Sequence, residues 1–164
     1  MLMDQKLVDL FQEQIKNEFE SAYIYLGMAA YFDASPYAGF ASWMHLQFKE
    51  EMEHGMRFFN HLIERGHNIK LLPIPAAATH YDSPLTAFKA ALEHEQLVTR
   101  LINEMYRVAV EINDYAAQIE LQWFIKEQVE EEQQTQQIVD QLALVGDNVA
   151  AILAIDRTAG ERKE

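Results

Sequence analysis

The chain has 164 residues, of which 26 are acidic and 13 basic, so its formal net charge is −13. This charge argues against binding to nucleic acid or to an anionic membrane surface, because both need cationic patches. The absence of cysteine excludes disulfides, thiolate metal sites and cysteine nucleophiles. With 49% hydrophobic residues, residues 1–164 are expected to form one domain around a substantial core.

No targeting or membrane segment is expected from the sequence. The first six residues lack a basic region followed by an apolar run, so we expect no signal peptide. The longest nearly apolar stretch, residues 22–32, is shorter than the ~20 residues that span a bilayer. The expected location is therefore the cytoplasm.

The first half of the chain predicts a pair of helices. Apolar residues recur every three or four positions over Asp4–Phe32, which predicts the first helix. Ser35-Pro36 separates it from a second helix over Tyr37–Arg65, and Gly66 is a typical C-terminal stop. The connection is short, so we expect the two helices to be antiparallel.

The second half repeats this arrangement after an irregular connection, residues 67–82. Ser83 is expected to cap a third helix that begins at Pro84 and ends near Ile112. After a short turn, a fourth helix continues to Val145, because no Gly or Pro interrupts it. A short fifth helix is predicted over Asn148–Thr158.

Four helices of this length bury their apolar faces best as a bundle. The connection over residues 67–82 is long enough to cross the bundle from end to end. We therefore predict an all-α fold: a four-helix bundle over about residues 4–145, with one long crossover and a short fifth helix over about 148–158.

Each long helix has an inward stripe of mostly apolar residues that is interrupted near its middle by polar side chains. The interrupting residues are Gln14 and Glu18, Gln47, Glu51 and His54, Glu95, and Gln128 and Glu131. No Lys or Arg on these stripes neutralises the acids, and an uncompensated buried carboxylate costs several kcal/mol. The natural compensating charge is one or more metal cations.

The spacing of these residues favours iron or manganese. Glu51 and His54 lie three residues apart and share one helix face. Such a Glu-x-x-His unit, with a Glu from a neighbouring helix, holds iron or manganese in helical bundles. Oxygen-rich ligands with one imidazole suit hard or borderline metals such as Fe²⁺ and Mn²⁺.

An internal repeat relates the two helix pairs. Three pairs of positions are each separated by 77 residues: Glu18 and Glu95, Glu51 and Gln128, and His54 and Glu131. Two halves related by pseudo-symmetry would present such matching positions. We expect two metal positions, one with the histidine and one purely carboxylate, bridged by Glu51.

Other candidate residues have ordinary structural interpretations. Five histidines lack such partners and are read as surface or hydrogen-bonded residues: His45, His61, His67, His80 and His94. Met52 is read as a packing residue of the outer face. Tyr25, on the same face as Glu18, is either a core tyrosine with a hydrogen-bond partner or a redox-active residue. Taken alone, the glutamates that flank the core positions belong to a solvated helix face.

Four segments, residues 14–25, 48–54, 92–99 and 121–132, carry a resemblance to a known family. In this order, and with the long crossover and short fifth helix, they resemble the bacterial and archaeal non-haem ferritins over nearly the whole chain. The resemblance implies iron storage with ferroxidase activity, with Fe(II) and O₂ or H₂O₂ as substrates. It also implies assembly into a cage of 24 identical subunits, with the fifth helix near a symmetry axis.

The resemblance also implies roles for individual residues. The first iron site would consist of Glu18, Glu51 and His54, and the second of Glu51, Glu95 and Glu131. Gln128 would be a hydrogen-bonding neighbour of the second site, and Tyr25 would supply an electron. A third iron site would consist of Glu50, Glu127 and Glu130 together with Glu131.

Other functions stay open at this point. A soluble di-iron oxidase or peroxidase without mineral storage would use the same ligands, and a metal-free helical interaction module would use none. Met52 falls where bacterioferritins place a haem-ligating methionine, but related non-haem ferritins can also have methionine there. A haem-containing bacterioferritin is therefore the less favoured alternative. The second Glu-x-x-His of bacterioferritins and rubrerythrins is replaced here by Gln128-x-x-Glu131.

Overall fold

The computed structural model describes residues 3–163, and this part of the chain is helical with no strand. The helices are α1 (Gln5–Asp33), α2 (Ala38–Glu64), α3 (Pro84–Glu111), α4 (Tyr115–Val145) and α5 (Val149–Gly160). The predicted all-α architecture is confirmed, and the predicted helix ends differ from these by at most two residues. The largest difference is at the end of α5, which continues to Gly160 instead of Thr158.

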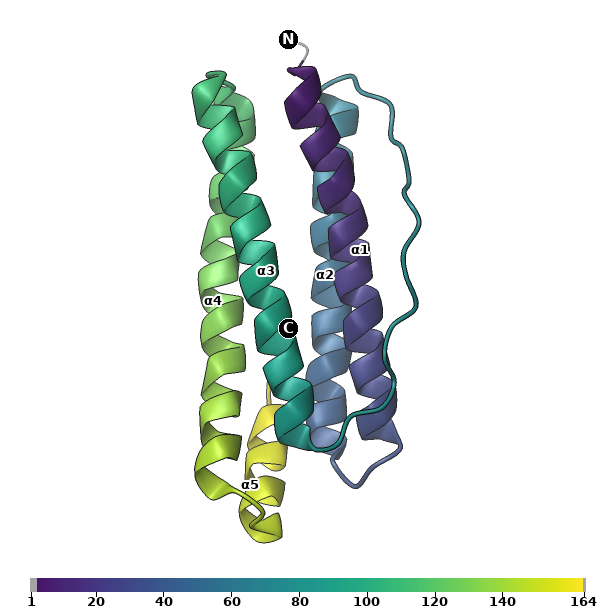
Figure 1. Ribbon diagram of the computed structural model, residues 1–164, viewed down its shortest axis with the longest axis vertical. Helices are drawn as coiled ribbons and strands as arrows, with labels where there is room; N and C mark the ends of the chain where they lie inside the picture. Colours follow the sequence, from purple (N-terminus) through teal and green to yellow (C-terminus); the bar gives the residue numbers. More distant parts are fainter. Residues whose placement is uncertain (1–2, 164) are drawn as a thin grey trace.

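Four long helices stand side by side, and α5 lies at one end of the bundle (Figure 1). The connection between α2 and α3 runs along the outside of the bundle from one end to the other, as the sequence predicts (Figure 1). A Cβ at Gly27 of α1 would lie 2.2 Å from the Ala78 carbonyl oxygen, so glycine allows this connection to approach α1 closely. None of the described helices is long and apolar enough to cross a membrane.

Side chains cap four of the five helix N-termini. Asp4, Ser83, Asp114 and Asn148 each accept a hydrogen bond from a backbone N–H of the first turn, and the predicted cap at Ser83 is among them. Tyr37, at the start of α2, makes no such bond. Helix α2 is capped from a distance instead, and this links it to α5.

The link between α2 and α5 is a buried aspartate. Asp156 of α5 is 5% exposed, and its Oδ1 accepts a 2.7 Å hydrogen bond from the Phe40 backbone N–H. The two helices touch here, because a Cβ at Gly39 would lie 1.7 Å from the Asp156 carbonyl oxygen. The first turn of α2 thus obtains its cap from a residue 116 positions away.

The apolar core is divided into two clusters along the bundle axis. One contains Phe11, Ile15, Phe58, Leu62, Val98, Ile102, Leu121 and Phe124. The other contains Tyr25, Met28, Phe32, Phe40, Met44, Phe88, Ile138 and Leu142. On each long helix the acidic residues of the predicted stripe lie between the two clusters in sequence. The bundle therefore has a polar layer across its middle.

Candidate metal centre

The polar layer brings together five side chains of types that can bind a metal ion, one or two from each long helix. Glu18, Glu51 and Glu95 are at most 1% exposed, and His54 and Glu131 are 5% exposed. All five are predicted ligands of the paired iron site. Apolar side chains cover the layer from above and below, so water does little to compensate the carboxylates.

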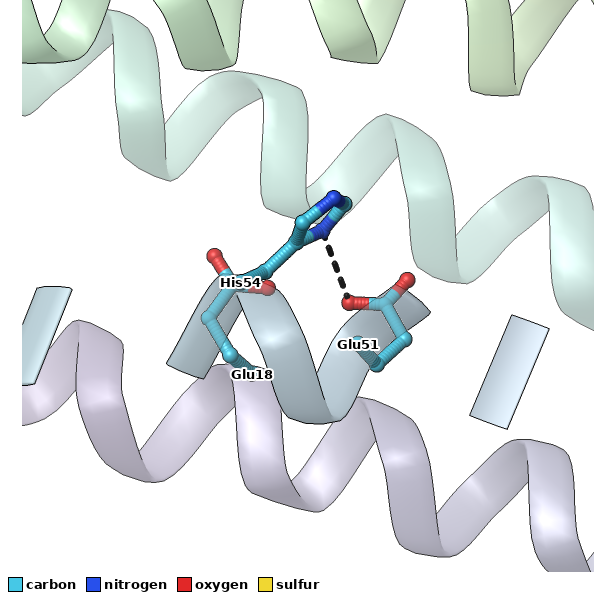
Figure 2. Close-up of side chains that lie close together, drawn as sticks. All are labelled: Glu18, Glu51 and His54. Carbon is cyan, nitrogen blue, oxygen red and sulfur yellow. Dashed lines mark ion pairs between the residues drawn. The ribbon is translucent and has the colours of Figure 1, made fainter. Parts of the chain in front are cut away.

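Two groups of ligand atoms converge within this layer. Glu18, Glu51 and His54 form one, and Glu51, Glu95 and Glu131 form the other; within each group the ligand atoms lie within 4.8 Å of one another. Figure 2 shows the first group, with Glu51 and His54 on α2 and Glu18 reaching across from α1. Glu51 belongs to both groups, in the bridging position that the sequence predicts.

Four ligand atoms in this layer have no hydrogen-bond partner within the described part of the chain. They are Glu18 Oε2, Glu51 Oε2, His54 Nδ1 and Glu131 Oε2. His54 Nδ1 lies 3.5 Å from Glu51 Oε2 (Figure 2) and 3.9 Å from Glu131 Oε1. Buried polar atoms without partners are costly. Cations between these atoms would satisfy all four, so the donor set fits metal ions.

Burial shifts the acidic groups of this layer towards their protonated forms in the metal-free protein. It raises the pKa of Glu18 to about 7 and that of Glu51 and Glu131 well above the usual range, with a further rise from neighbouring carboxylates. The pKa of Glu95 is also raised by burial, although hydrogen bonds from Tyr25 and Gln128 oppose the rise.

The histidine responds to burial in the opposite sense. Burial, and secondarily the positive charge of Arg57, lower the pKa of His54 to about 4. At neutral pH the imidazole is therefore uncharged and has a lone pair for a metal ion. Because the carboxyls must lose protons when they bind a cation, metal binding by this layer releases protons.

Neighbouring side chains orient the ligands by hydrogen bonds. Gln14 Nε2 donates to Glu18 Oε1 at 2.7 Å. Gln128 Nε2 donates to Glu95 Oε2 at 3.1 Å and to the Glu95 backbone oxygen at 3.2 Å. Gln128 therefore occupies the place that the prediction assigns to it, next to the second group and outside it. The role of Gln14 was missed, although its position one turn before Glu18 is visible in the sequence.

Tyr25 is in direct contact with the ligand layer. Its ring is fully buried, and its hydroxyl donates a hydrogen bond to Glu95 Oε1. Burial and the carboxylates around it raise the pKa of Tyr25 well above its usual value, so it is a phenol and not a phenolate. This hydrogen bond agrees with the interpretation of Tyr25 as a core tyrosine with a hydrogen-bond partner. Its role as a redox-active residue stays a prediction.

The ring of His54 is held by aromatic packing that the sequence did not indicate. Trp123 and Phe124 lie edge-on to it, with ring centroids 5.5 and 5.8 Å away. The Arg57 guanidinium lies 3.9 Å from the Trp123 ring centroid and bonds Glu120 at 2.5 Å. These contacts join residues more than 60 positions apart, which local patterns do not reveal.

The residues of the predicted third site are less close together. Among the described residues, no group that includes Glu50, Glu127 or Glu130 meets the spacing found for the paired groups. Glu50 lines one open hollow with Glu127 and a second with Glu130. Its carboxylate is paired with Arg162, at 2.6 Å. The third site stays a prediction, in a half-buried to exposed setting.

Four of the five remaining histidines have ordinary contacts, as expected. His45 is 2.8 Å from Asp33, His67 accepts a bond from the Met3 N–H, His94 is 2.6 Å from the Ser21 hydroxyl, and His80 packs against Tyr31. His61 differs: its ring stacks on Phe11, and its buried Nε2 has no partner within residues 3–163. Burial lowers the pKa of His61, which keeps it neutral.

Met52 is 39% exposed and lines an apolar hollow of about 390 Å³ with Phe19, Tyr23, Phe48 and Ile74. This location agrees with an outer-face packing residue. Met52 lies on the opposite side of α2 from the inward stripe that carries Glu51 and His54.

Comparisons with known proteins agree with the four-helix fold and the buried ligand layer. Residues 8–145 match the Ferritin family, described as the ferritin-like domain. A bacterial non-heme ferritin from Bacteroides fragilis is 37% identical over 161 residues, which is 98% of this chain and 100% of that protein. One from Staphylococcus aureus is 33% identical over 98% of this chain and 97% of its own length.

Solved structures agree closely with the fold. An open pore ferritin from the hyperthermophilic archaeon Archaeoglobus fulgidus superposes with a TM-score of 0.95 at 40% identity, covering 98% of this chain and 99% of that one. A humanized archaeal ferritin superposes with a TM-score of 0.96 at 40% identity, covering 98% of each chain. The chain therefore belongs to the ferritin family.

Proposed function

We propose that this protein stores iron and oxidises Fe(II) at the paired site. The observation that carries the proposal is the set of four buried ligand atoms without partners, on side chains from α1, α2 and α4. Two Fe²⁺ ions, as substrates, would bind the groups bridged by Glu51 and together give two electrons to O₂ or peroxide. The Fe³⁺ product would then leave for a mineral inside the protein cage.

The residues of the site would have distinct tasks. His54 would offer an uncharged nitrogen to the metal. The four carboxyls would release their protons when Fe²⁺ binds in place of those protons. Gln14, Gln128 and Tyr25 hold the carboxylates in place by hydrogen bonds. Tyr25 is also placed to give an electron, and the hydroxyl proton would pass along its hydrogen bond to Glu95.

We further propose assembly into a cage of 24 copies in the cytoplasm. Ferritins are the structural relatives of this chain, and several large apolar side chains are exposed that other copies would cover in a cage. Tyr115, Ile119, Leu144 and Val149 are between 62% and 87% exposed. The mass of the assembly, measured by light scattering, tests this: a cage gives about 24 times 19.0 kDa, whereas a dimer would favour a soluble oxidase that stores no mineral.

Aerobic loading with many Fe²⁺ per subunit tests storage directly. A soluble ferric core that co-elutes with the protein supports the proposal. Precipitation of iron outside the protein, at the rate seen in buffer alone, would contradict it. Anaerobic titration separates the steps, since the paired site predicts two tightly bound Fe²⁺ per subunit and a metal-free interaction module predicts none.

We also propose that Glu50, Glu127 and Glu130, with Glu131, form a third iron site. Its support is electrostatic: the charges of Glu130 and Glu50 each contribute to raising the pKa of Glu127, and burial is the larger cause. Like charges held near one another in this way attract a cation.

A further inference from the structure

The residues after α5 approach the ligand layer from outside the four-helix bundle. Helix α5 contacts α2 and α4 at one end of the bundle (Figure 1). Arg162 is the residue after α5 that makes this approach. It lines an open hollow of about 650 Å³ together with Trp43, Glu50 and Glu130.

Arg162 is held by three residues of α2. Its guanidinium donates to Glu50 Oε2 at 2.6 Å and to Gln47 Oε1 at 2.5 Å, and it lies 5.0 Å from the Trp43 ring centroid. The arginine side chain is only 17% exposed. Gln47 is 1% exposed, and it uses its oxygen for Arg162 although its own amide nitrogen has no partner in the described chain. A surface ion pair would not show this degree of enclosure.

This arrangement places a positive charge where a third cation would bind. Glu50 is the only predicted third-site ligand on α2, whereas Glu127, Glu130 and Glu131 come from α4. Arg162 holds Oε2 of Glu50, so a metal ion must compete with the guanidinium for the charge and for one oxygen of this carboxylate. The paired site contrasts with this, because its free atoms are buried and unpartnered.

We propose that Arg162 is a resident counter-cation of the third site, and that a metal ion competes with its guanidinium for Glu50. This inference rests on the proposed third site. It makes Arg162 a positioning residue that weakens binding there, so that iron passes through the site instead of staying. Arg162 does not affect the binding of the two metal ions at the paired site.

Calorimetric titration with Zn²⁺, which undergoes no redox reaction, tests the proposal. The wild-type protein should show two tight binding events and a weaker third. Arg162→Gln should bind the third ion about ten-fold more tightly, since a charge-assisted pair no longer competes. Arg162→Lys keeps the charge and should resemble the wild type. The control is Arg157→Gln, because Arg157 bonds only its own helix, at the Leu153 carbonyl oxygen, in the described contacts.

A spectroscopic readout follows the competition itself. Because Arg162 lies on the Trp43 ring, the third Zn²⁺ should change the Trp43 emission in the wild type and should leave it unchanged in Arg162→Gln. Trp43→Phe identifies the signal, because the change should vanish in that variant. Glu50→Gln should lose the third event and keep the first two.

The outcomes separate this inference from the proposed function. An unchanged or weaker third event in Arg162→Gln, an equal gain in Arg157→Gln, or no third event in any variant would overturn the role of Arg162. In each of these cases, two tight events with rapid iron oxidation would leave the paired site standing. Absence of any tight event would overturn both.

Discussion

Glu50 and Glu51 are neighbours in the sequence but lie in two different environments. Glu51 faces the core, is 1% exposed and has an oxygen without a partner. Glu50 is half-buried and paired with Arg162. Glu130 and Glu131 repeat the contrast on α4, because successive residues of a helix point about 100° apart.

The difference suggests a rule: the group that neutralises a carboxylate determines how tightly that carboxylate can bind a metal ion. The inner set consists of the carboxyls of Glu18, Glu51, Glu95 and Glu131. Among the described contacts it has no Lys or Arg partner, and its neighbour His54 is uncharged, so protons or metal ions must neutralise it. The outer set consists of Glu50, Glu127 and Glu130. Arg162 pairs with Glu50, whereas Glu127 is partly exposed and Glu130 is exposed to solvent. We therefore expect the inner set to hold metal tightly and the outer set to exchange it.

Removal of the bridge should have the largest effect. Glu51→Ala takes a ligand from both groups, so rapid iron oxidation should slow by at least about 100-fold. Stopped-flow absorbance at two Fe²⁺ per subunit measures this. Glu13→Ala, which changes an exposed carboxylate of α1, should stay within about two-fold, and a wild-type rate in Glu51→Ala would rule out the bridging role.

The second prediction concerns the helix that carries Arg162. Gly39→Ala places a methyl group 1.7 Å from the Asp156 carbonyl oxygen, so α5 must move and the cap of α2 is lost. We expect a stability loss of about 3 kcal/mol in chemical denaturation. The third Zn²⁺ should also bind more tightly, as in Arg162→Gln.

Ser42→Ala is the control for this change, because it alters an exposed residue of the same helix and should cost less than about 0.5 kcal/mol. A fully stable Gly39→Ala protein would show that α5 contributes little to the fold.

The third prediction concerns the protons of the inner set. The pKa of Glu18 is raised from 4.5 to about 7 by burial, so the folded metal-free protein binds this proton more tightly than the unfolded chain. The stability from this group is present below pH 4.5 and is lost as the pH rises through 7. Glu18→Gln cannot ionise, so it should be more stable than the wild type by about 2 kcal/mol at pH 8.

Denaturation of the metal-free proteins at pH 4 and pH 8 measures this difference. The gain in stability of Glu18→Gln over the wild type should be near zero at pH 4, where the Glu18 carboxyl is mostly protonated in both the folded and the unfolded protein. Glu130→Gln, which changes an exposed carboxylate of α4, is the matched control. An equal gain in both variants would mean that the two sets do not differ in the way proposed.

The smallest effect on binding is expected for Tyr25→Phe. The ring stays in the core, and Glu95 loses the Tyr25 hydrogen bond but keeps the one from Gln128, so anaerobic Fe²⁺ affinity should stay within about two-fold. The distribution of oxidation products should change, because the donor of an additional electron is lost. Rapid-freeze electron paramagnetic resonance checks this, and identical radical signals in both proteins would remove the redox role.

Much of the fold and of the inner set could be predicted because the signals are local. The spacing of apolar residues determined the four long helices, and Ser83 and Pro84 marked the start of α3. Glu18, Glu51, His54, Glu95 and Glu131 stood out because each is a polar residue on an apolar stripe. The repeat of 77 residues then placed them at one level of the bundle.

Interactions between distant parts of the chain could not be predicted in this way. Arg162 carries no sign in the sequence that it contacts Glu50, which lies 112 residues earlier. The same holds for the Asp156 cap on Phe40 and for the packing of Trp123 on His54. Each depends on how α5 or α4 lies against α2, which short-range spacing does not encode.

The sequence by itself thus determined which side chains enter the core, because helical periodicity assigns each residue to a face. Only the tertiary structure decided which carboxylates stay uncompensated. That depends on where the few cationic groups come to lie, and the position of Arg162 is set by the close approach of α5 to Gly39 of α2.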